Sequence, residues 1–297
     1  MFRPGQLSPL RHPGGKGKVA DFVQQLVEQN DIMDGYYVEP YAGGGAVALE
    51  LLLRGIVHRV ALNDISVHIH SFWRSVLEQP DELCALVQST PLDVDSWDRQ
   101  KAIVKKACED DFLATGFATL FLNRTNRSGI LNGGPIGGRD QTGNWLIDAR
   151  YNVDALDSKI QIIAQYSSHI DLTKIDAVDF LRNGANIWPD NTLVYLYPPY
   201  FHKGRDLYYH SYVASDHLDV FDSLAHLKKQ KWLVSYDDCA EIREIYFDLP
   251  TLSYQLGHTA RSFRSGSEVM FFKPGIKIPL PGRSMKNPCL EPIKSHS

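Results

Sequence analysis

The chain has 297 residues, of which 43% are hydrophobic and 22% are charged, and its formal net charge is −4. This length and composition are those of an ordinary globular protein with one large α/β domain or a core domain plus an inserted module. The sequence has no run of about 18 apolar residues, so no helix is expected to span a membrane. The net negative charge argues against bulk electrostatic binding of nucleic acid, although a local basic patch could still supply it.

The N-terminus and the cysteines indicate the compartment. Residues 1–6 lack the apolar core of a signal peptide, and the cysteines are scattered without metal or disulfide spacing. The four positions are Cys84, Cys108, Cys239 and Cys289. We therefore expect a cytoplasmic protein with mostly buried thiols, no metal site and no contact with a membrane.

The first predicted element is a loop rich in proline and glycine, residues 8–18, that leads into a helix with an apolar stripe starting at Val19. The unpaired backbone N–H groups at the start of this helix, together with Lys16, can meet an anion. The alternative is a flexible N-terminal arm with solvated lysines.

A strand, a glycine turn and a helix follow at residues 35–40, 41–46 and 47–53. Three successive glycines let the backbone approach a ligand closely, as in dinucleotide- and adenosyl-binding turns. The next strand ends at Asp64, about 20 residues further on, where a carboxylate can accept hydrogen bonds from ribose hydroxyls. Together they predict an adenosine site, although Asp64 is equally suited to capping the helix that begins near Ser66.

The middle of the chain reads as an insert. Residues 65–114 repeat apolar side chains at helical intervals, whereas residues 121–145 alternate arginines, amides and glycines and are not expected to bury themselves. Such a segment can lie along phosphates and base edges, the alternative being a mobile surface loop. The candidate DNA-binding residues are Asn123, Arg124, Asn126, Arg127 and Arg139.

Residues 193–197 form an apolar and aromatic run that predicts a buried strand, which must stop at Pro198-Pro199 because proline cannot donate to a sheet ladder. Tyr200 then stands at the carboxyl end of a strand, where open α/β sheets bind ligands, and its ring can stack on a planar substrate. The alternative is a strand that merely ends in a surface loop. Upstream, a strand-to-helix turn places Asp179 where it can accept from an adenine amino group.

The last part of the chain predicts a strand at residues 232–236 that ends in Asp237-Asp238, and then a hairpin built from residues 251–255 and 267–272. Residues 273–297 have no hydrophobic period and are expected to form a flexible tail.

The order of these stretches resembles the Dam-like, α-class (D12 class) DNA N6-adenine methyltransferases over roughly residues 7–272. The segment Pro9–Lys16 matches the family's opening motif except at His12, and the turn at residues 38–45 matches its cofactor motif. The resemblance implies S-adenosyl-L-methionine as cofactor. Its binding residues would be Pro13, Gly14, Lys16, Glu39, Pro40, Tyr41, Ala42, Gly43, Gly45, Asp64, Asp179 and Phe180.

The resemblance further implies a Rossmann-like methyltransferase sheet, α/β in class, with an inserted and mainly helical DNA-recognition module. The catalytic and cofactor domain would comprise residues 7–65 and 169–272, and the recognition module residues 66–168. The implied reaction is methyl transfer to N6 of adenine in duplex DNA after base flipping. Double-stranded DNA would be the partner, alongside other subunits of a restriction–modification or defence system in a bacterial, archaeal or phage-encoded setting.

One position departs from the family. The catalytic tetrad of active members begins with Asp, Asn or Ser, whereas here it reads Tyr197-Pro198-Pro199-Tyr200. The missing group accepts a hydrogen bond from the target amine, and losing one such preorganised acceptor costs about 10²–10³ in rate. Three hypotheses follow: a methyltransferase that works poorly or through another acceptor such as Asp237, a catalytically silent homologue that still binds cofactor or DNA, and a binding protein that keeps the fold alone.

Overall fold

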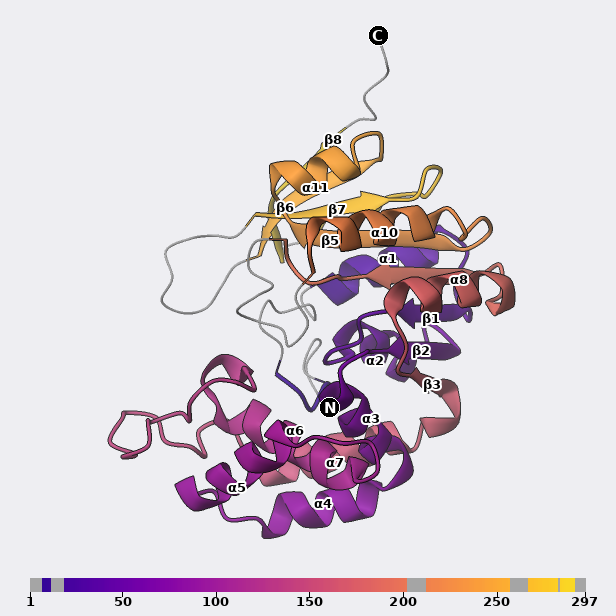
Figure 1. Ribbon diagram of the computed structural model, residues 1–297. Helices are drawn as coiled ribbons and strands as arrows, with labels where there is room; N and C mark the ends of the chain where they lie inside the picture. The colour runs from indigo at the N-terminus through magenta and orange to yellow at the C-terminus, as the bar shows by residue number, and fades with distance from the viewer. Residues whose placement is uncertain (1–6, 12–18, 202–211, 257–266, 283, 292–297) are drawn as a thin grey trace.

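The apolar runs of the sequence form the strands of one mixed sheet in the computed structural model, which describes residues 7–11, 19–201, 212–256, 267–282 and 284–291 (Figure 1). Within these residues the strands lie in the order β3-β2-β1-β4-β5-β7-β6-β8. The strands are β1 (Tyr36–Glu39), β2 (Arg59–Asn63), β3 (Ile170–Thr173), β4 (Thr192–Leu196), β5 (Lys231–Asp237), β6 (Thr251–Leu256), β7 (Ser267–Phe272) and β8 (Met285–Glu291).

The first five strands are parallel and the last three are antiparallel to their neighbours. The α/β class is therefore confirmed. Strand β4 lies at the centre, between β1 and β5, and every one of its residues is buried. It ends at Leu196, as the double proline that follows requires. The motif after β4 thus emerges at the middle of the sheet's carboxyl edge.

Helices cover both faces of the sheet because strand side chains alternate between the faces. Leu193 and Tyr195 of β4 pack on the side of α1 (Ala20–Gln29) and α2 (Ala46–Leu53). Val194 and Leu196 pack in the second core, on the opposite side. The helices there are α8 (Ala177–Ile187), α10 (Ala214–Leu224) and α11 (Ala240–Ile245).

Between β2 and β3 the chain forms a module of helices that lies below the sheet in Figure 1. The helices predicted for residues 65–114 are present, and α6 lies among them: Gly116 of α6 approaches α3 so closely that a Cβ would stand 2.6 Å from Ser71 O. The module contains α3 (Val67–Glu78), α4 (Pro80–Ser89), α5 (Val94–Lys105), α6 (Phe112–Thr125), η2 (Arg127–Gly129), α7 (Val153–Ala164) and η3 (Ser167–His169).

Two expectations were wrong. The segment that starts at Phe121 was expected not to bury itself. Its first five residues instead form the C-terminal part of α6, and Asn126 is fully buried. The reason is that α6 lies in the core of the module. The tail beyond Lys273 was expected to lack structure, yet Met285–Glu291 forms β8. Strand β8 pairs with β6 at the sheet edge through backbone hydrogen bonds and leaves most of its side chains exposed, so that it has no hydrophobic period to read.

No helix among the residues that the structure describes is long and apolar enough to cross a membrane.

Candidate active site

The glycine turn after β1 folds tightly against the helical module. Gly43 and Gly45 have φ angles of 48° and 57°, in a region that residues with a Cβ atom rarely adopt. A Cβ on Gly45 would lie 3.0 Å from the Trp73 ring, and the Trp73 indole N–H donates to Gly43 O at 2.9 Å. Sequence analysis missed Trp73, which links α3 of the insert to the predicted cofactor turn.

Two carboxylates brace this turn from its two sides. Asp64, after β2, accepts from the Gly43 N–H at 2.9 Å and from the Ser66 N–H at 3.0 Å. Glu39, which is 5% exposed, accepts from the Ala48 N–H in the first turn of α2 at 3.1 Å. Asp64 thus bonds the N–H of Ser66, the residue just before α3, although the first turn of α3 has no side-chain cap hydrogen bond. Ribose binding by Asp64 stays a prediction.

Asn63, which sequence analysis overlooked, links the ends of β1, β2 and β3 through hydrogen bonds. The Asn63 amide donates to Pro40 O at 3.1 Å and to Ile175 O at 3.0 Å, and its oxygen accepts from the Thr173 hydroxyl at 2.8 Å. The backbone N–H of Ala42, which is buried, donates to Asn63 O at 2.9 Å. The signal was an asparagine at the end of an otherwise apolar strand. Predicted cofactor residues Pro13, Gly14 and Lys16 lie outside the described residues.

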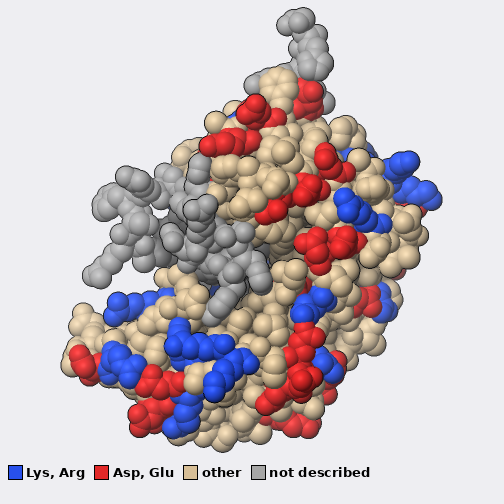
Figure 2. All heavy atoms as spheres, viewed as in Figure 1, with Lys and Arg blue, Asp and Glu red and all other residues tan. Residues whose placement is uncertain are grey.

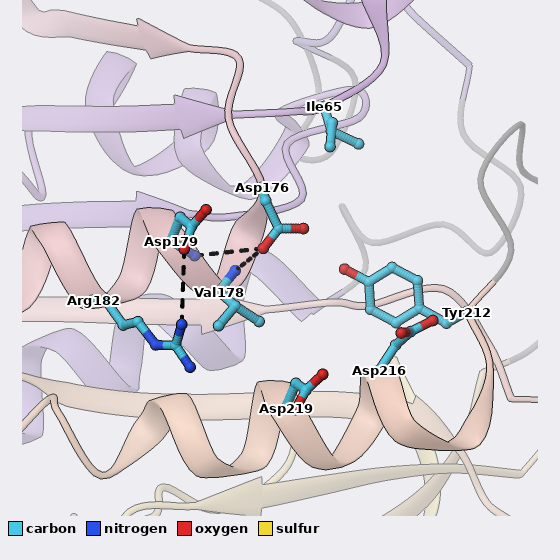
Figure 3. Close-up of a pocket in the computed structure, with 8 residues that line it drawn as sticks. All are labelled: Ile65, Asp176, Val178, Asp179, Arg182, Tyr212, Asp216 and Asp219. Carbon is cyan, nitrogen blue, oxygen red and sulfur yellow. Dashed lines mark hydrogen bonds and ion pairs between the residues drawn. The ribbon is translucent and has the colours of Figure 1, made fainter.

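A pocket of about 460 Å³ opens beside this edge, between α8 and α10 (Figure 3). Asp176 caps α8 by accepting from the Val178 N–H at 2.8 Å, and Asp179 stands 3.8 Å from the Arg182 guanidinium. The carboxylates suit ligand groups that donate hydrogen bonds, such as amino and hydroxyl groups. The lining residues are Ile65, Asp176, Val178, Asp179, Arg182, Tyr212, Asp216 and Asp219.

The other predicted residues near this pocket lie below or beside it. Phe180 is 6% exposed and packs edge-on against Trp188 with ring centroids 5.1 Å apart, so its ring supports α8 from the core. The Tyr41 hydroxyl pairs with that of Tyr212 at 3.0 Å. Burial raises the pKa of Tyr212 to about 12, and Tyr212 therefore stays neutral near pH 7.

The motif after β4 meets a carboxylate from a distant strand. The Tyr197 hydroxyl donates to Glu268 Oε2 at 2.8 Å, and the Tyr200 hydroxyl donates to Glu268 Oε1 at 2.6 Å. The two phenol oxygens are 2.9 Å apart. Glu268 lies on β7 and is only 4% exposed. Pro198 and Pro199 are buried between the two tyrosines.

Burial raises the pKa of Tyr197 well above its ordinary value, and the negative charge of Glu268 raises it further. Tyr197 is therefore a neutral hydrogen-bond donor. Asp237, the alternative acceptor considered from the sequence, accepts from the Phe201 N–H at 3.1 Å. Glu268 was missed, although a carboxylate inside the apolar stretch of residues 267–272 was a visible signal.

Two of the candidate DNA-binding residues hold the N-terminal segment against α6. The Arg124 guanidinium donates to Pro9 O at 2.6 Å through Nε, and burial lowers the pKa of Arg124 to about 10. The Asn123 amide oxygen accepts from the Arg11 N–H at 2.6 Å, and its Nδ2 donates to Arg11 O at 2.8 Å. These contacts order the chain just before the predicted cofactor segment.

The remaining candidates divide between core and surface. Asn126 is fully buried and accepts from the Trp97 indole at 2.6 Å. Arg127 and Arg139 are exposed, and Arg139 forms an ion pair with Asp98 at 2.8 Å. Figure 2 shows basic side chains gathered over the helical module, interspersed with acidic ones. Base or phosphate contacts by any of these residues stay predictions.

A mainly parallel sheet with a glycine turn after β1, a carboxylate after β2 and an aromatic motif after β4 defines a class of adenosyl- or nucleotide-binding α/β proteins. The chain belongs to the D12 class N6 adenine-specific DNA methyltransferase family, whose model matches residues 12–258. S-adenosyl-L-methionine is therefore its cofactor. The residues present fit it, since the turn has glycines at two positive-φ positions and the adjoining pocket supplies carboxylate acceptors.

The chain is also similar to solved structures, though distantly. The rRNA methyltransferase AviRa from Streptomyces viridochromogenes shares 12% identity with it at a TM-score of 0.42, over 91% of this chain and 93% of that chain. A putative class I S-adenosylmethionine-dependent methyltransferase from Listeria monocytogenes shares 10% identity at a TM-score of 0.38, over 96% of this chain and 67% of the other. No curated protein matches the chain.

Proposed function

We propose that this chain transfers a methyl group from S-adenosyl-L-methionine to N6 of adenine in duplex DNA, after the base has flipped out of the helix. One observation carries the proposal: the Pro-Pro-Tyr motif after β4 stands beside a buried carboxylate, Glu268, which supplies the charge that Tyr197 lacks. Family membership supports the substrate class.

The exocyclic amine of adenine is a poor nucleophile because its lone pair is delocalised into the ring. The chain's task is therefore to accept hydrogen bonds from that amine and to stabilise the positive charge that develops on it. In our proposal the Tyr197 oxygen and the Pro198 carbonyl are these acceptors, and Tyr200 stacks on the flipped base. When bound, S-adenosyl-L-methionine supplies an electrophilic methyl group.

Cofactor binding would fall to the residues at the carboxyl edge. Asp64 fixes the glycine turn by accepting from the Gly43 N–H, and Glu39 accepts from the Ala48 N–H at the start of α2. In our proposal Asp64 also accepts from the ribose. Asp179, at the rim of the pocket, accepts from the adenine amino group of the cofactor. DNA would be held by the exposed Arg127 and Arg139 on the helical module, with phosphate contacts fixing the register.

A second candidate is a catalytically silent homologue that binds cofactor, DNA or both and serves as a sensing or scaffolding subunit. The observation in its favour is that a bulky neutral phenol, Tyr197, stands where the family motif has Asp, Asn or Ser and is already hydrogen-bonded within the protein. In this case the ring would occupy the place of the flipped base.

Transfer of a labelled methyl group to mixed-sequence duplex DNA separates the two candidates. The protein is compared with Tyr197→Asp, and cofactor binding is measured on both by calorimetry. Label in DNA, at N6 of adenine after hydrolysis to nucleosides, is the result expected of the unmodified protein. Cofactor binding without transfer, with activity gained by Tyr197→Asp, would instead establish the silent homologue.

A further inference from the structure

A buried histidine packs between the two halves of the candidate site. His217, near the start of α10, is fully buried, and three aromatic rings surround its imidazole. The ring centroids of Phe201, Tyr236 and Tyr212 lie 5.2, 5.4 and 5.5 Å from that of His217. His217 does not line the pocket of Figure 3, so its effect on the site must pass through these neighbours.

Two of these neighbours belong to different halves of the site. Phe201 directly follows Tyr200 of the motif after β4, and its backbone N–H donates to Asp237 Oδ1 at 3.1 Å. Tyr212 lines the pocket, and Figure 3 shows its ring at one side of it. The Tyr212 hydroxyl pairs at 3.0 Å with that of Tyr41, in the turn after β1. One imidazole thus contacts both the residue next to the motif and a wall of the pocket.

A hydrogen bond to β5 fixes the rotation of this imidazole. Nδ1 of His217 lies 3.1 Å from the Tyr236 hydroxyl. Tyr236 immediately precedes Asp237, which accepts from the Phe201 N–H, so the bond links α10 to the strand end that holds the motif. Because the bond sets the plane of the imidazole, it also sets how Phe201 and Tyr212 pack against it.

The imidazole lowers stability in a way that packing alone does not explain. Its other nitrogen, Nε2, is buried and has no hydrogen-bond partner among the residues that the structure describes. An unpaired buried polar atom is unfavourable, and a phenyl ring would avoid it. Burial lowers the pKa of His217, although the negative charges of Asp216 and Asp237 act in the opposite direction, so the ring is neutral near pH 7. The nitrogen with a role is therefore Nδ1.

We propose that His217 is a positioning residue for methyl transfer: held by Tyr236, it fixes Phe201 and Tyr212 together and so aligns the motif after β4 with the cofactor pocket. The inference rests on the proposed function, because it concerns how the two ligands of that reaction are aligned. The amine nitrogen and the methyl carbon must meet in one orientation, and a misplacement of about 1 Å can cost about 10²-fold in rate. A residue that touches neither ligand can therefore control kcat.

Kinetics of Tyr236→Phe are the gentlest test, because this change removes one oxygen and keeps the ring. We expect kcat to fall about tenfold, with KM for DNA unchanged within about threefold. His217→Phe removes the same bond from the other side, so it should have the same effect, and the double variant should be no worse than either single one. Tyr36→Phe is the matched control, since it also loses a phenol hydrogen bond, to Asp171 at 2.6 Å, but at the start of β1.

Melting temperatures separate positioning from support of the fold. Positioning predicts that His217→Phe melts within about 3 °C of the unmodified protein, because loss of the unpaired Nε2 offsets loss of the bond. Leu224→Ala, in the same helix, is the opposite control: it should melt lower while kcat stays within about threefold. A kcat that simply follows melting temperature across all variants would show that His217 supports the fold alone.

Hydrogen exchange gives a readout without catalysis. The two prolines of the motif have no N–H, so the amides that follow them are those of Tyr200 and Phe201, and the Phe201 amide is hydrogen-bonded. Mass spectrometry of a peptide that spans these residues should show exchange about tenfold faster in Tyr236→Phe and in His217→Phe. The Tyr36→Phe control should exchange at the original rate. An unchanged rate in both test variants would overturn the inference.

The outcomes separate the two proposals. An active protein whose kcat and Phe201 exchange survive both test substitutions keeps the proposed function and loses the inference. A protein that transfers no methyl group in any form loses the proposed function, and the exchange rates still decide whether His217 fixes the motif after β4. If His217→Phe does not fold, Tyr236→Phe carries the test alone, since it adds no volume to the core.

Discussion

Replacing Asp64 by alanine is the sharpest test of the cofactor site. The substitution removes the acceptor for two backbone N–H groups, Gly43 at 2.9 Å and Ser66 at 3.0 Å. Hydrogen bonds to charged groups contribute about 1.5–3 kcal/mol each. Because Asp64 is half-buried, water can bond the two N–H groups in the variant and recover much of this free energy. We expect a net loss of about 1.5 kcal/mol in unfolding free energy, or about 3 °C in melting temperature.

The effect on cofactor binding should be larger than the effect on stability. If Asp64 also accepts from the ribose, alanine loses a charge-assisted bond worth about 1.5–3 kcal/mol, which corresponds to a rise of about 10–150-fold in Kd for S-adenosyl-L-methionine. Asp64→Asn separates the two roles in part, because its amide oxygen can still accept from the Gly43 N–H while its NH2 group replaces the oxygen that accepts from the Ser66 N–H. It should melt between Asp64→Ala and the unmodified protein and still bind the cofactor more weakly.

Calorimetric titration with S-adenosyl-L-methionine, together with thermal unfolding without ligand, measures both quantities. Asn152→Ala is the matched control: Asn152 caps α7 in the helical module by accepting from the Ala155 N–H at 2.8 Å, so its loss costs about 1 kcal/mol away from the sheet edge. That variant should melt lower and bind cofactor normally. An Asp64→Ala protein whose Kd stays within about threefold of the original would refute ribose binding by Asp64.

Three other substitutions follow from the structure. Arg124→Ala should lower the melting temperature with little change in the salt dependence of duplex binding, because the Arg124 guanidinium holds Pro9 O. Exposed Arg127 differs: Arg127→Ala should weaken duplex binding and reduce its salt slope by about one. Filter binding across salt concentrations compares the two variants. Gly45→Ala should raise the Kd for S-adenosyl-L-methionine and lower the melting temperature, because φ is 57° and the new Cβ would meet Trp73. Burial lowers the pKa of Lys159 to about 8, so the charged form of Lys159 opposes folding below that pH. The free energy of unfolding, measured by denaturant titration, should therefore rise between pH 8 and 10. Lys159→Met should abolish this rise.

The sequence by itself determined the elements whose cause is local. Pro198 and Pro199 end β4 at Leu196 because neither can donate to the ladder, and the glycines after β1 form a turn with positive φ because no other residue adopts it as easily. Apolar spacing likewise predicted the helices of the insert and the hairpin of β6 and β7. These signals act between neighbours in the chain, so a reader of the sequence can find them.

Only the tertiary structure decided which side chains meet. The register of β5 with β7 brings Glu268 to Tyr197, and no local pattern encodes a contact between residues so far apart. Because α6 packs inside the module, Asn126 at its end points inward and bonds Trp97. The composition of the surrounding segment, residues 121–145, had instead resembled that of a surface loop. Strand β8 exists because β6 offers an unpaired edge, and backbone hydrogen bonds need no hydrophobic period. The carboxylate proposed for the active site was thus supplied by the pairing of strands.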